Sequence, residues 1–343
     1  MFDFVGVTTL VILILVFGFF TLRAWKAKSR WLKWVGMALS GLLTLFTAVL
    51  LLLSLLGFYK LNEQFDNPVQ EVQVAGTPDQ IARGKQLANI CVSCHTPGEQ
   101  LPLSGSNFAA KFDFPPLGTL YAPNLTPSGN IADWTDGEVI RAIREGVDRN
   151  GRSLLIMPSV NFRNMSDEDV QALVAYLRSQ PAEGKPTPEN RFNLLGAIFM
   201  NLSDFRVAQS PVGHVTAPQA ESVAYGKYMV DIIGCRDCHG DQLQGKVENG
   251  QPGPPPGPNL TQIIPQWSEE EFMTFFNTGT LPGGGTVPII TLKSGFSEPK
   301  MPWPTVRAAA TDEELKAMYA YLHSLSPVEG PTQPIEGQAL QSN

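Results

Sequence analysis

The sequence predicts an all-α protein in which an N-terminal two-helix transmembrane hairpin precedes two tandem copies of one small helical domain. Three observations lead to this prediction: two uncharged apolar runs at the N-terminus, a five-residue cysteine motif that occurs twice, and a longer repeat around each copy of that motif. A chain of 343 residues has room for two ordinary domains and an additional segment.

The hairpin is predicted within residues 1–59. Residues 5–22 and 35–58 carry no charge, and each run is close to the about 20 residues that a bilayer-spanning helix needs. A buried core helix is one alternative, but both runs come before any domain that would cover them. A cleaved signal peptide is another. Residues 1–4 lack Lys and Arg, no small-residue cleavage site follows, and we therefore expect both helices in the mature protein.

The short connection between the two runs predicts their orientation. It carries five cations, at Arg23, Lys26, Lys28, Arg30 and Lys33. By the positive-inside rule this connection faces the cytoplasm. We therefore expect a two-pass protein of the bacterial cytoplasmic membrane, with everything after Tyr59 on the periplasmic side.

The charge of the remaining chain limits its partners. Beyond residue 58 there are 20 basic and 31 acidic residues, a net charge of −11. So acidic a surface excludes nucleic acid as the expected partner. It suits either plain solubility or attraction to a basic face on another protein.

The cysteine motif is "CVSCH" at residues 91–95 and "CRDCH" at residues 235–239, and the two copies use all four cysteines. Disulfides, a thioredoxin-like redox pair and a zinc site are alternatives. The redox pair needs a βαβ context, and Cys94 and Cys235 are 141 residues apart, which is far beyond zinc-ribbon spacing. None of these uses a histidine directly after the second cysteine. The C-x-x-C-H pattern is that of covalent haem attachment.

Each motif lies in the same larger repeat. "ARGK" precedes the first copy and "AYGK" the second, "PNLT" follows both, and "WTDGE" corresponds to "WSEEE". Met157 and Met301 each lie 62 residues after the histidine of their motif. The repeat ends in a helix that begins at Ser166 or Thr311, each an N-cap hydroxyl followed by an acid three residues later.

These repeats predict one domain at residues 76–181, a linker at 182–215, a second domain at 216–327 and a disordered tail at 328–343. The linker contains the apolar stretch "RFNLLGAIFMNLSDF". It is too short to span a bilayer, and it lies either on the membrane surface or over the interface between the domains. We favour the second position, because a surface helix normally carries more cations. The second domain has additional Gly- and Pro-rich loops, either partner contacts or spacers.

On these motifs, residues 76–327 resemble two class I cytochrome c domains. "YAPNLTP", "WTDGE" and "MSDEDVQALVAYL" look most like the multihaem cytochrome subunits of membrane-bound dehydrogenases and related dihaem carriers. The two-span hairpin and the loops of the second domain depart from that pattern.

The resemblance implies two covalently bound haem c groups, held by Cys91, Cys94, Cys235 and Cys238. It implies His95 and His239 as proximal iron ligands and Met157 and Met301 as distal ligands. Met165 competes with Met157, although its position before the helix cap explains it by burial. The remaining histidines are His214 and His323, and either is an alternative to a methionine as distal ligand.

Two further pairs of residues have expected roles. The carbonyls of Pro123 and Pro258 are candidates to orient the proximal imidazoles. Gly84 and Gly226 are expected to let the first helix of each domain approach the helix that carries Tyr176 or Tyr321.

The function that follows is electron transfer by a membrane-anchored dihaem subunit or tethered shuttle. It would connect a quinol-oxidising complex or dehydrogenase with an acceptor such as a terminal oxidase or reaction centre. Its expected partners are other redox subunits or soluble carriers. A dihaem enzyme of the peroxidase or thiosulfate-oxidising type is the alternative, and it requires one open or labile haem. A structural membrane subunit is less favoured, because both haem motifs would then have no use.

Overall fold

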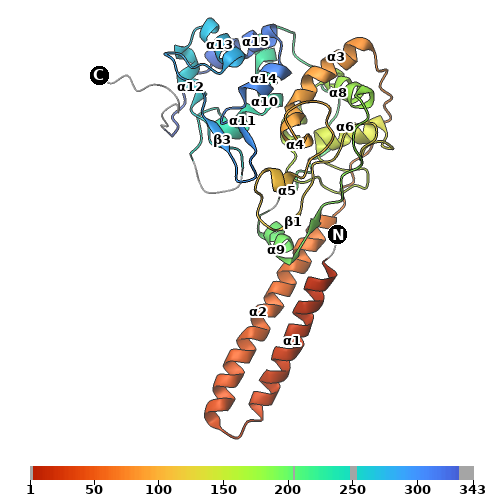
Figure 1. The fold of residues 1–343 in the computed structure, drawn as a ribbon, viewed down its shortest axis with the longest axis vertical. Coiled ribbons are helices and arrows are strands. Elements are labelled where there is room, and N and C mark those ends of the chain that lie inside the picture. Colours follow the sequence, from red (N-terminus) through yellow and green to blue (C-terminus); the bar gives the residue numbers. More distant parts are fainter. Residues whose placement is uncertain (1–2, 204, 248–252, 332–343) are drawn as a thin grey trace, which may run out of the picture.

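The computed structural model describes residues 3–203, 205–247 and 253–331. Within these ranges the chain is mostly helical, as the sequence predicts, and Figure 1 shows a long helical hairpin below two smaller helical units. The predicted tail lies outside the described residues from position 332 onward.

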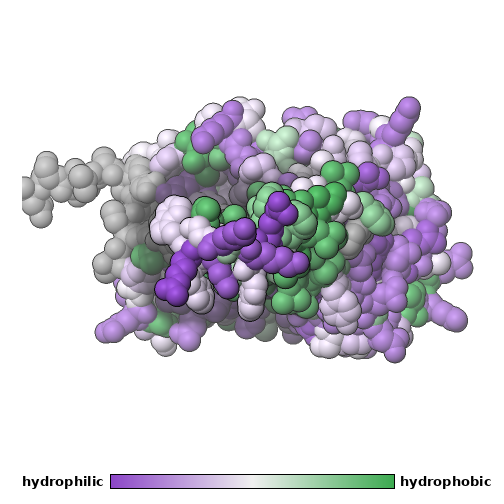
Figure 2. Space-filling model, turned by 90° about the horizontal axis from the view of Figure 1, so that it is seen from below, coloured by the Kyte–Doolittle hydropathy of each residue, from purple (hydrophilic) through white to green (hydrophobic). Residues whose placement is uncertain are grey.

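The hairpin consists of α1 (Phe4–Trp25) and α2 (Arg30–Asn62). Both are long and apolar enough to cross a membrane by length and composition, and their most apolar windows are only 6% and 17% buried. A helix from the core of a soluble domain would be largely covered, so the exposure disfavours that alternative. Seen from below in Figure 2, hydrophobic surface gathers at the hairpin, while the surrounding domains are mainly hydrophilic.

The first domain and the segment after it contain short helices around long loops. In chain order they are α3 (Pro78–Leu87), η1 (Ala88–Cys91), α4 (Val92–His95), α5 (Phe108–Lys111), β1 (Gly118–Thr119), α6 (Asp136–Glu145), α7 (Ser159–Phe162), α8 (Asp167–Ser179), β2 (Arg191–Phe192) and α9 (Leu194–Leu202). Strands β1 and β2 pair antiparallel, with Gly118 opposite Phe192.

The second domain repeats this order. Its elements are α10 (Val223–Ile233), α11 (Cys235–His239), α12 (Leu260–Ile263), η2 (Ile264–Gln266), α13 (Glu269–Thr278), β3 (Ile289–Thr291), β4 (Ser297–Pro299), α14 (Trp303–Ala309) and α15 (Asp312–His323). Strands β3 and β4 form an antiparallel hairpin with Ile290 opposite Glu298. The described part of the first domain has no such hairpin between α6 and α7.

Glycine lets the first and last helices of each domain cross closely. A Cβ on Gly84 of α3 would lie 1.8 Å from the carbonyl oxygen of Ala172 in α8. A Cβ on Gly226 of α10 would lie 1.9 Å from the carbonyl oxygen of Ala317 in α15. Any side chain would force the helices apart, so the expected role of both glycines is confirmed.

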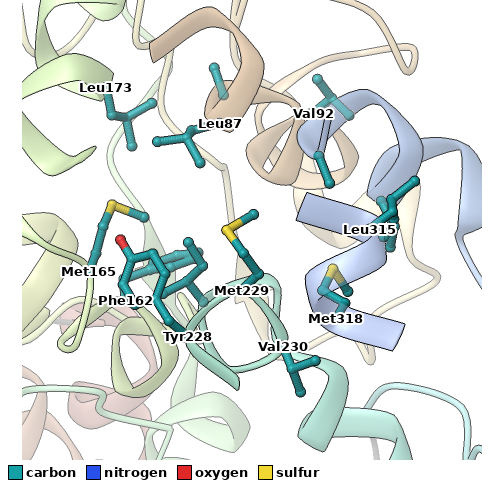
Figure 3. Packing of buried hydrophobic residues seen from close by; sticks show 14 of the residues in the cluster. Leu87, Val92, Phe162, Met165, Leu173, Tyr228, Met229, Val230, Leu315 and Met318 are labelled. Carbon is teal, nitrogen blue, oxygen red and sulfur yellow. The ribbon is translucent and has the colours of Figure 1, made fainter. Parts of the chain in front are cut away.

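The apolar core continues across the boundary between the two domains. Figure 3 shows Met229 of the second domain between Leu87 and Val92 of the first domain and Leu315 and Met318 of its own. All five side chains are at most 3% exposed. Because the two domains share this core, they are held in one relative orientation.

A buried polar network closes the same boundary. The Arg83 guanidinium donates from Nε to Asp169 Oδ1 (2.7 Å) and from Nη1 to Glu314 Oε1 (2.6 Å). Tyr225 donates to Glu314 (2.8 Å) and Tyr228 to Asp169 (2.6 Å). The network is built from equivalent positions, since Arg83 and Tyr225 correspond in the repeat, as do Asp169 and Glu314. The interface therefore has approximate twofold symmetry.

The linker helix α9 lies elsewhere than we expected. It packs on α2, where a Cβ on Gly57 would meet the carbonyl oxygen of Ala197 at 1.8 Å and Lys60 Nζ donates to the carbonyl of Asn201 at 3.0 Å. The expectation that this stretch covers the interface between the domains is therefore wrong. Helix α9 instead lies at the junction between the first domain and the α1–α2 hairpin (Figure 1).

Candidate functional site

Each domain encloses an apolar cavity with its cysteine motif in the wall. The space inside is ≈ 1330 Å³ in the first domain and ≈ 1250 Å³ in the second, open mouths included. Apolar side chains line most of each cavity. The cavities are thus suited to a large, mostly apolar ligand.

The predicted site residues of the first domain come together around its cavity. Cys91, Cys94 and His95 line one part, where η1 runs into α4, and Met157 lines the loop before α7. The second domain brings Cys235, Cys238 and His239 of α11 together with Met301 before α14. Residues 62 positions apart in the sequence therefore face the same space in both domains.

Backbone carbonyls fix the orientation of both motif histidines. Nδ1 of His95 lies 2.8 Å from the carbonyl oxygen of Pro123, and Nδ1 of His239 lies 2.8 Å from that of Pro258. A carbonyl only accepts, so each ring donates from Nδ1 and leaves Nε2 unprotonated. This arrangement confirms the predicted role of the two prolines and suits metal ligation through Nε2.

Burial keeps the imidazoles neutral. It lowers the pKa of His95 and of His239, and the hydrogen bond to Pro123 or Pro258 only partly opposes this effect. A neutral ring is the form that binds a metal ion.

None of the four cysteines forms a disulfide. Burial raises the pKa of Cys91 and of Cys235 to about 12, and that of Cys94 and of Cys238 to about 11. Such thiols are poor nucleophiles and poor redox catalysts at neutral pH. Their position in an apolar wall beside a neutral histidine fits thioether attachment of a haem better than thiol chemistry.

The methionines can be sorted by comparing the two cavity walls. Met165 also lines the first cavity, but it is 1% exposed and its counterpart in the second domain is Ala310. Met318 lines the second cavity, but its counterpart is Leu173. Among the residues lining the two cavities, Met157 and Met301 alone are methionines at equivalent positions.

The remaining histidines do not reach the cavities. His214 is exposed and its Nδ1 is hydrogen-bonded to Asp167 Oδ2. His323 is exposed on α15 and its ring lies 5.3 Å from that of Tyr319. Neither residue lines the space in which a second axial ligand would be needed.

One charged residue beside the first motif was not singled out from the sequence. Lys111 at the end of α5 is 9% exposed, and its ammonium donates to the carbonyls of Ser93 (2.6 Å), Thr96 (3.0 Å) and Gly98 (3.0 Å). In "FAAKFDF" it looks like an ordinary surface lysine. No periodicity or spacing in the sequence marks it as buried.

The β3–β4 hairpin of the second domain covers this lysine. Phe296 lies 4.5 Å from Lys111 Nζ, measured to the ring centroid, and its ring packs edge-on against Phe112. Ser294 Oγ donates to the carbonyl of Lys111 at 2.7 Å. The loop predicted as a partner contact or a spacer thus contacts the first domain of its own chain.

Comparison with known proteins agrees with this geometry. The cytochrome c family model matches residues 81–181 and 223–326, more than half of the chain. A nicotinate dehydrogenase subunit from Pseudomonas putida is 31% identical over 285 residues, which are 77% of this chain and 22% of that protein.

Two other relatives are named as cytochrome subunits. The cytochrome c subunit of alcohol dehydrogenase (quinone) from Gluconacetobacter polyoxogenes is 28% identical, over 74% of this chain and 58% of its own length. The fructose dehydrogenase cytochrome subunit of Gluconobacter japonicus is 25% identical, over 62% and 47%. This chain therefore spans between about a fifth and three fifths of the length of these relatives.

Proposed function

The chain belongs to the cytochrome c family, and we propose on this basis that it is a membrane-anchored electron-transfer subunit with two covalently bound haem groups. Cys91 and Cys94 would attach one haem, and Cys235 and Cys238 the other. The thiols line the same cavities as the histidines and are unpaired, which is what attachment requires.

The proposal rests above all on a methionine at the same place in both cavities. His95 and Met157 would hold the iron in the first domain, and His239 and Met301 would hold it in the second. This would leave no open position for substrate or peroxide. A haem so ligated supplies one-electron chemistry. The protein's part is to hold each imidazole through its proline carbonyl and to keep water away with apolar walls.

We propose a dehydrogenase as the electron donor. The relatives above are named as subunits of nicotinate, alcohol and fructose dehydrogenases, and two of those names specify the cytochrome subunit. The acceptor would be a downstream respiratory component such as a terminal oxidase.

The hairpin supports a position on the bacterial cytoplasmic membrane. Helices α1 and α2 would span the bilayer with the cationic connection in the cytoplasm and both haem domains in the periplasm. Helix α9 beside the end of α2 would then lie near the periplasmic surface.

The decisive experiment is to produce the full chain in a host that matures c-type cytochromes and to measure haem per polypeptide in the membrane fraction. We expect two covalent haem groups, low-spin spectra for both irons and two reversible one-electron steps. Met157→Ala and Met301→Ala should each alter the spectrum and potential of one haem, while Met165→Leu should alter neither.

Two results would contradict the proposal. Bare polypeptide from a host that matures other c-type cytochromes would refute haem attachment. One high-spin iron with rapid peroxide turnover would refute the carrier and favour the dihaem enzyme.

A further inference from the structure

The surroundings of the two haem motifs differ mainly in charge. Both walls that face the motifs are apolar: α6 supplies Val139, Ala142 and Ile143, and α13 supplies the equivalent Phe272, Phe275 and Phe276. Burial therefore acts in the same direction on both sites. Fixed charges nearby have to account for any difference between them, and they include Lys300, a half-buried residue in the wall of the second cavity.

A lysine contacts the same carbonyl in both domains. Lys111 Nζ donates to the carbonyl of Ser93 at 2.6 Å, and Lys246 Nζ donates to that of Asp237 at 2.8 Å. Ser93 and Asp237 both directly precede the second cysteine of their motif. The contacts differ in burial, because Lys111 is 9% exposed whereas Lys246 is exposed. A charge beneath a protein surface acts about four times as strongly as the same charge in water.

The acids near these lysines do not remove the difference. Glu298 of β4 interacts with Lys111 and also with Cys94 and Cys238, so its charge acts on both domains. Glu99 interacts with Lys111, but it is exposed to solvent. In the second domain the carboxylate of Asp237 lies within the motif itself and accepts a hydrogen bond from Asn161 at 2.6 Å. Arg236 of the same motif pairs with Asp231 at 2.7 Å, so the second site keeps the negative charge of Asp237.

The buried charges on the wall helices have to be counted as well. Arg141 and Arg144 of α6 are 7% and 2% exposed, and they correspond to the uncharged Thr274 and Asn277 of α13. Glu145, which is also buried, corresponds to Thr278 and offsets one of the two arginines. Asp167 offsets the other, because it pairs with Arg144 at 2.8 Å. The buried charges of this wall therefore balance, and Lys111 remains as the difference.

We propose that Lys111 gives the haem site of the first domain the higher midpoint potential, so that electrons pass from the second domain to the first. A buried cation stabilises an iron that has gained an electron. In this step one electron leaves the iron of the second domain and reduces the iron of the first, and no other reactant is needed. The inference rests on the proposed function above.

This assignment gives electron transfer through the protein a direction. The first domain is joined to α2 through Lys60 and α9, and the second domain lies farther from the hairpin (Figure 1). A periplasmic donor would deliver electrons to the second domain. Its acceptor would take them from the first domain, next to the membrane.

The test is potentiometric titration of the haem-loaded protein carrying Lys111→Met. We expect the higher of the two midpoint potentials to fall by at least about 59 mV, a tenfold change in equilibrium constant for one electron. Lys246→Met is the matched control and should change the lower potential much less. Lys111→Arg keeps the charge and should restore most of the wild-type value.

Two further measurements separate charge from structural damage. Phe296→Ala leaves Lys111 in place but opens it to water, so it should lower the same potential by a smaller amount. The effect of Lys111 should persist at high salt, whereas that of an exposed charge is screened.

The outcomes are distinct. If Lys111→Met shifts the lower potential instead, the first domain holds the lower-potential site and the proposed direction of transfer is wrong. If neither potential shifts, Lys111 does not set the potential of either site. If the wild type shows no two-step reversible reduction, the proposed function itself fails.

Discussion

The two cytochrome c domains share the geometry of their motifs and differ in what surrounds it. Each has a motif histidine 2.8 Å from a proline carbonyl, a cavity-lining methionine and a glycine at the crossing of its terminal helices. The buried lysine and buried arginines belong to the first domain, and the β3–β4 hairpin belongs to the second. The two repeats thus share the geometry of their motifs, while charge and contacts have diverged.

The interface shows the same division. Asp169 and Glu314 are both acids at equivalent helix positions. The hydrogen-bond donors at the position facing them differ, because the first repeat has Arg83 where the second has Tyr225. One cation therefore serves two carboxylates. An exact twofold arrangement would place either two cations or none at this point.

Replacing Arg83 should have the largest effect on stability. Arg83→Met leaves the buried carboxylates of Asp169 and Glu314 facing each other without a positive charge. We expect a loss of about 2–5 kcal/mol in the free energy of unfolding, measured by denaturant titration of the haem-loaded protein. Adding Asp169→Asn and Glu314→Gln to this variant should recover part of the loss.

A surface ion pair provides the control for Arg83. Arg149 pairs with Asp133 at 2.6 Å, but the two side chains are 35% and 77% exposed. Arg149→Met should therefore cost at most about 1 kcal/mol. Equal losses in the two variants would show that Arg83 does not act through a buried network.

The two glycines test whether the domains are equally constrained. Gly84→Ala and Gly226→Ala each place a methyl group less than 2 Å from a backbone carbonyl oxygen. We expect each to cost about 1–3 kcal/mol or more, because the helices must separate. Thermal unfolding followed by circular dichroism would measure both losses.

Gly98→Ala is the matched control, since its new methyl group would meet open space. It should change stability little. A large loss from only one of the two crossing glycines would show that one domain can relax where the other cannot.

The smallest expected effect is a loss of stability at acid pH that arises from Asp167 in the first domain. Burial disfavours the ionised form of Asp167, but hydrogen bonds from His214 and Arg144 hold the pKa of Asp167 below its usual value. Its contribution to stability is therefore present above about pH 4, the unfolded value, and is lost as the pH falls through the lower folded value. Asp167→Asn should flatten the fall in melting temperature below about pH 4.

The equivalent acid of the second domain is Asp312, which pairs with Arg307 at 2.6 Å and is 54% exposed. Asp312→Asn should change the fall in melting temperature at acid pH less than Asp167→Asn does. Identical pH profiles for the two variants would contradict a role limited to the first domain.

The features that could be predicted from the sequence are those marked by the repeat or by hydropathy. Motif spacing identified the cavity-lining cysteines, histidines and methionines, and hydropathy identified α1 and α2. These features depend on residues close in sequence or on a pattern that occurs twice. For the same reason the contacts of Pro123 and Pro258 could be inferred before any coordinates were known.

What the sequence did not predict depends on how the parts meet. Lys111 is buried because a hairpin about 180 residues later in the chain covers it. Helix α9 was assigned to the wrong interface, because an apolar face does not specify which surface it covers. Arg83 looked like an ordinary helix residue, since only the relative orientation of the domains brings two acids to it.

The attachment of the first domain to α2 has a mechanical consequence. The helix is 33 residues long, about 50 Å, whereas a bilayer core is about 30 Å thick. Beyond its end, Phe65 donates to the carbonyl of Gly151 at 2.7 Å and Glu63 forms an ion pair with Arg206. The first domain is thus fixed to the end of α2. In the proposed membrane-anchored carrier it would not swing between distant partners, so both the electron donor and the electron acceptor would have to come to it.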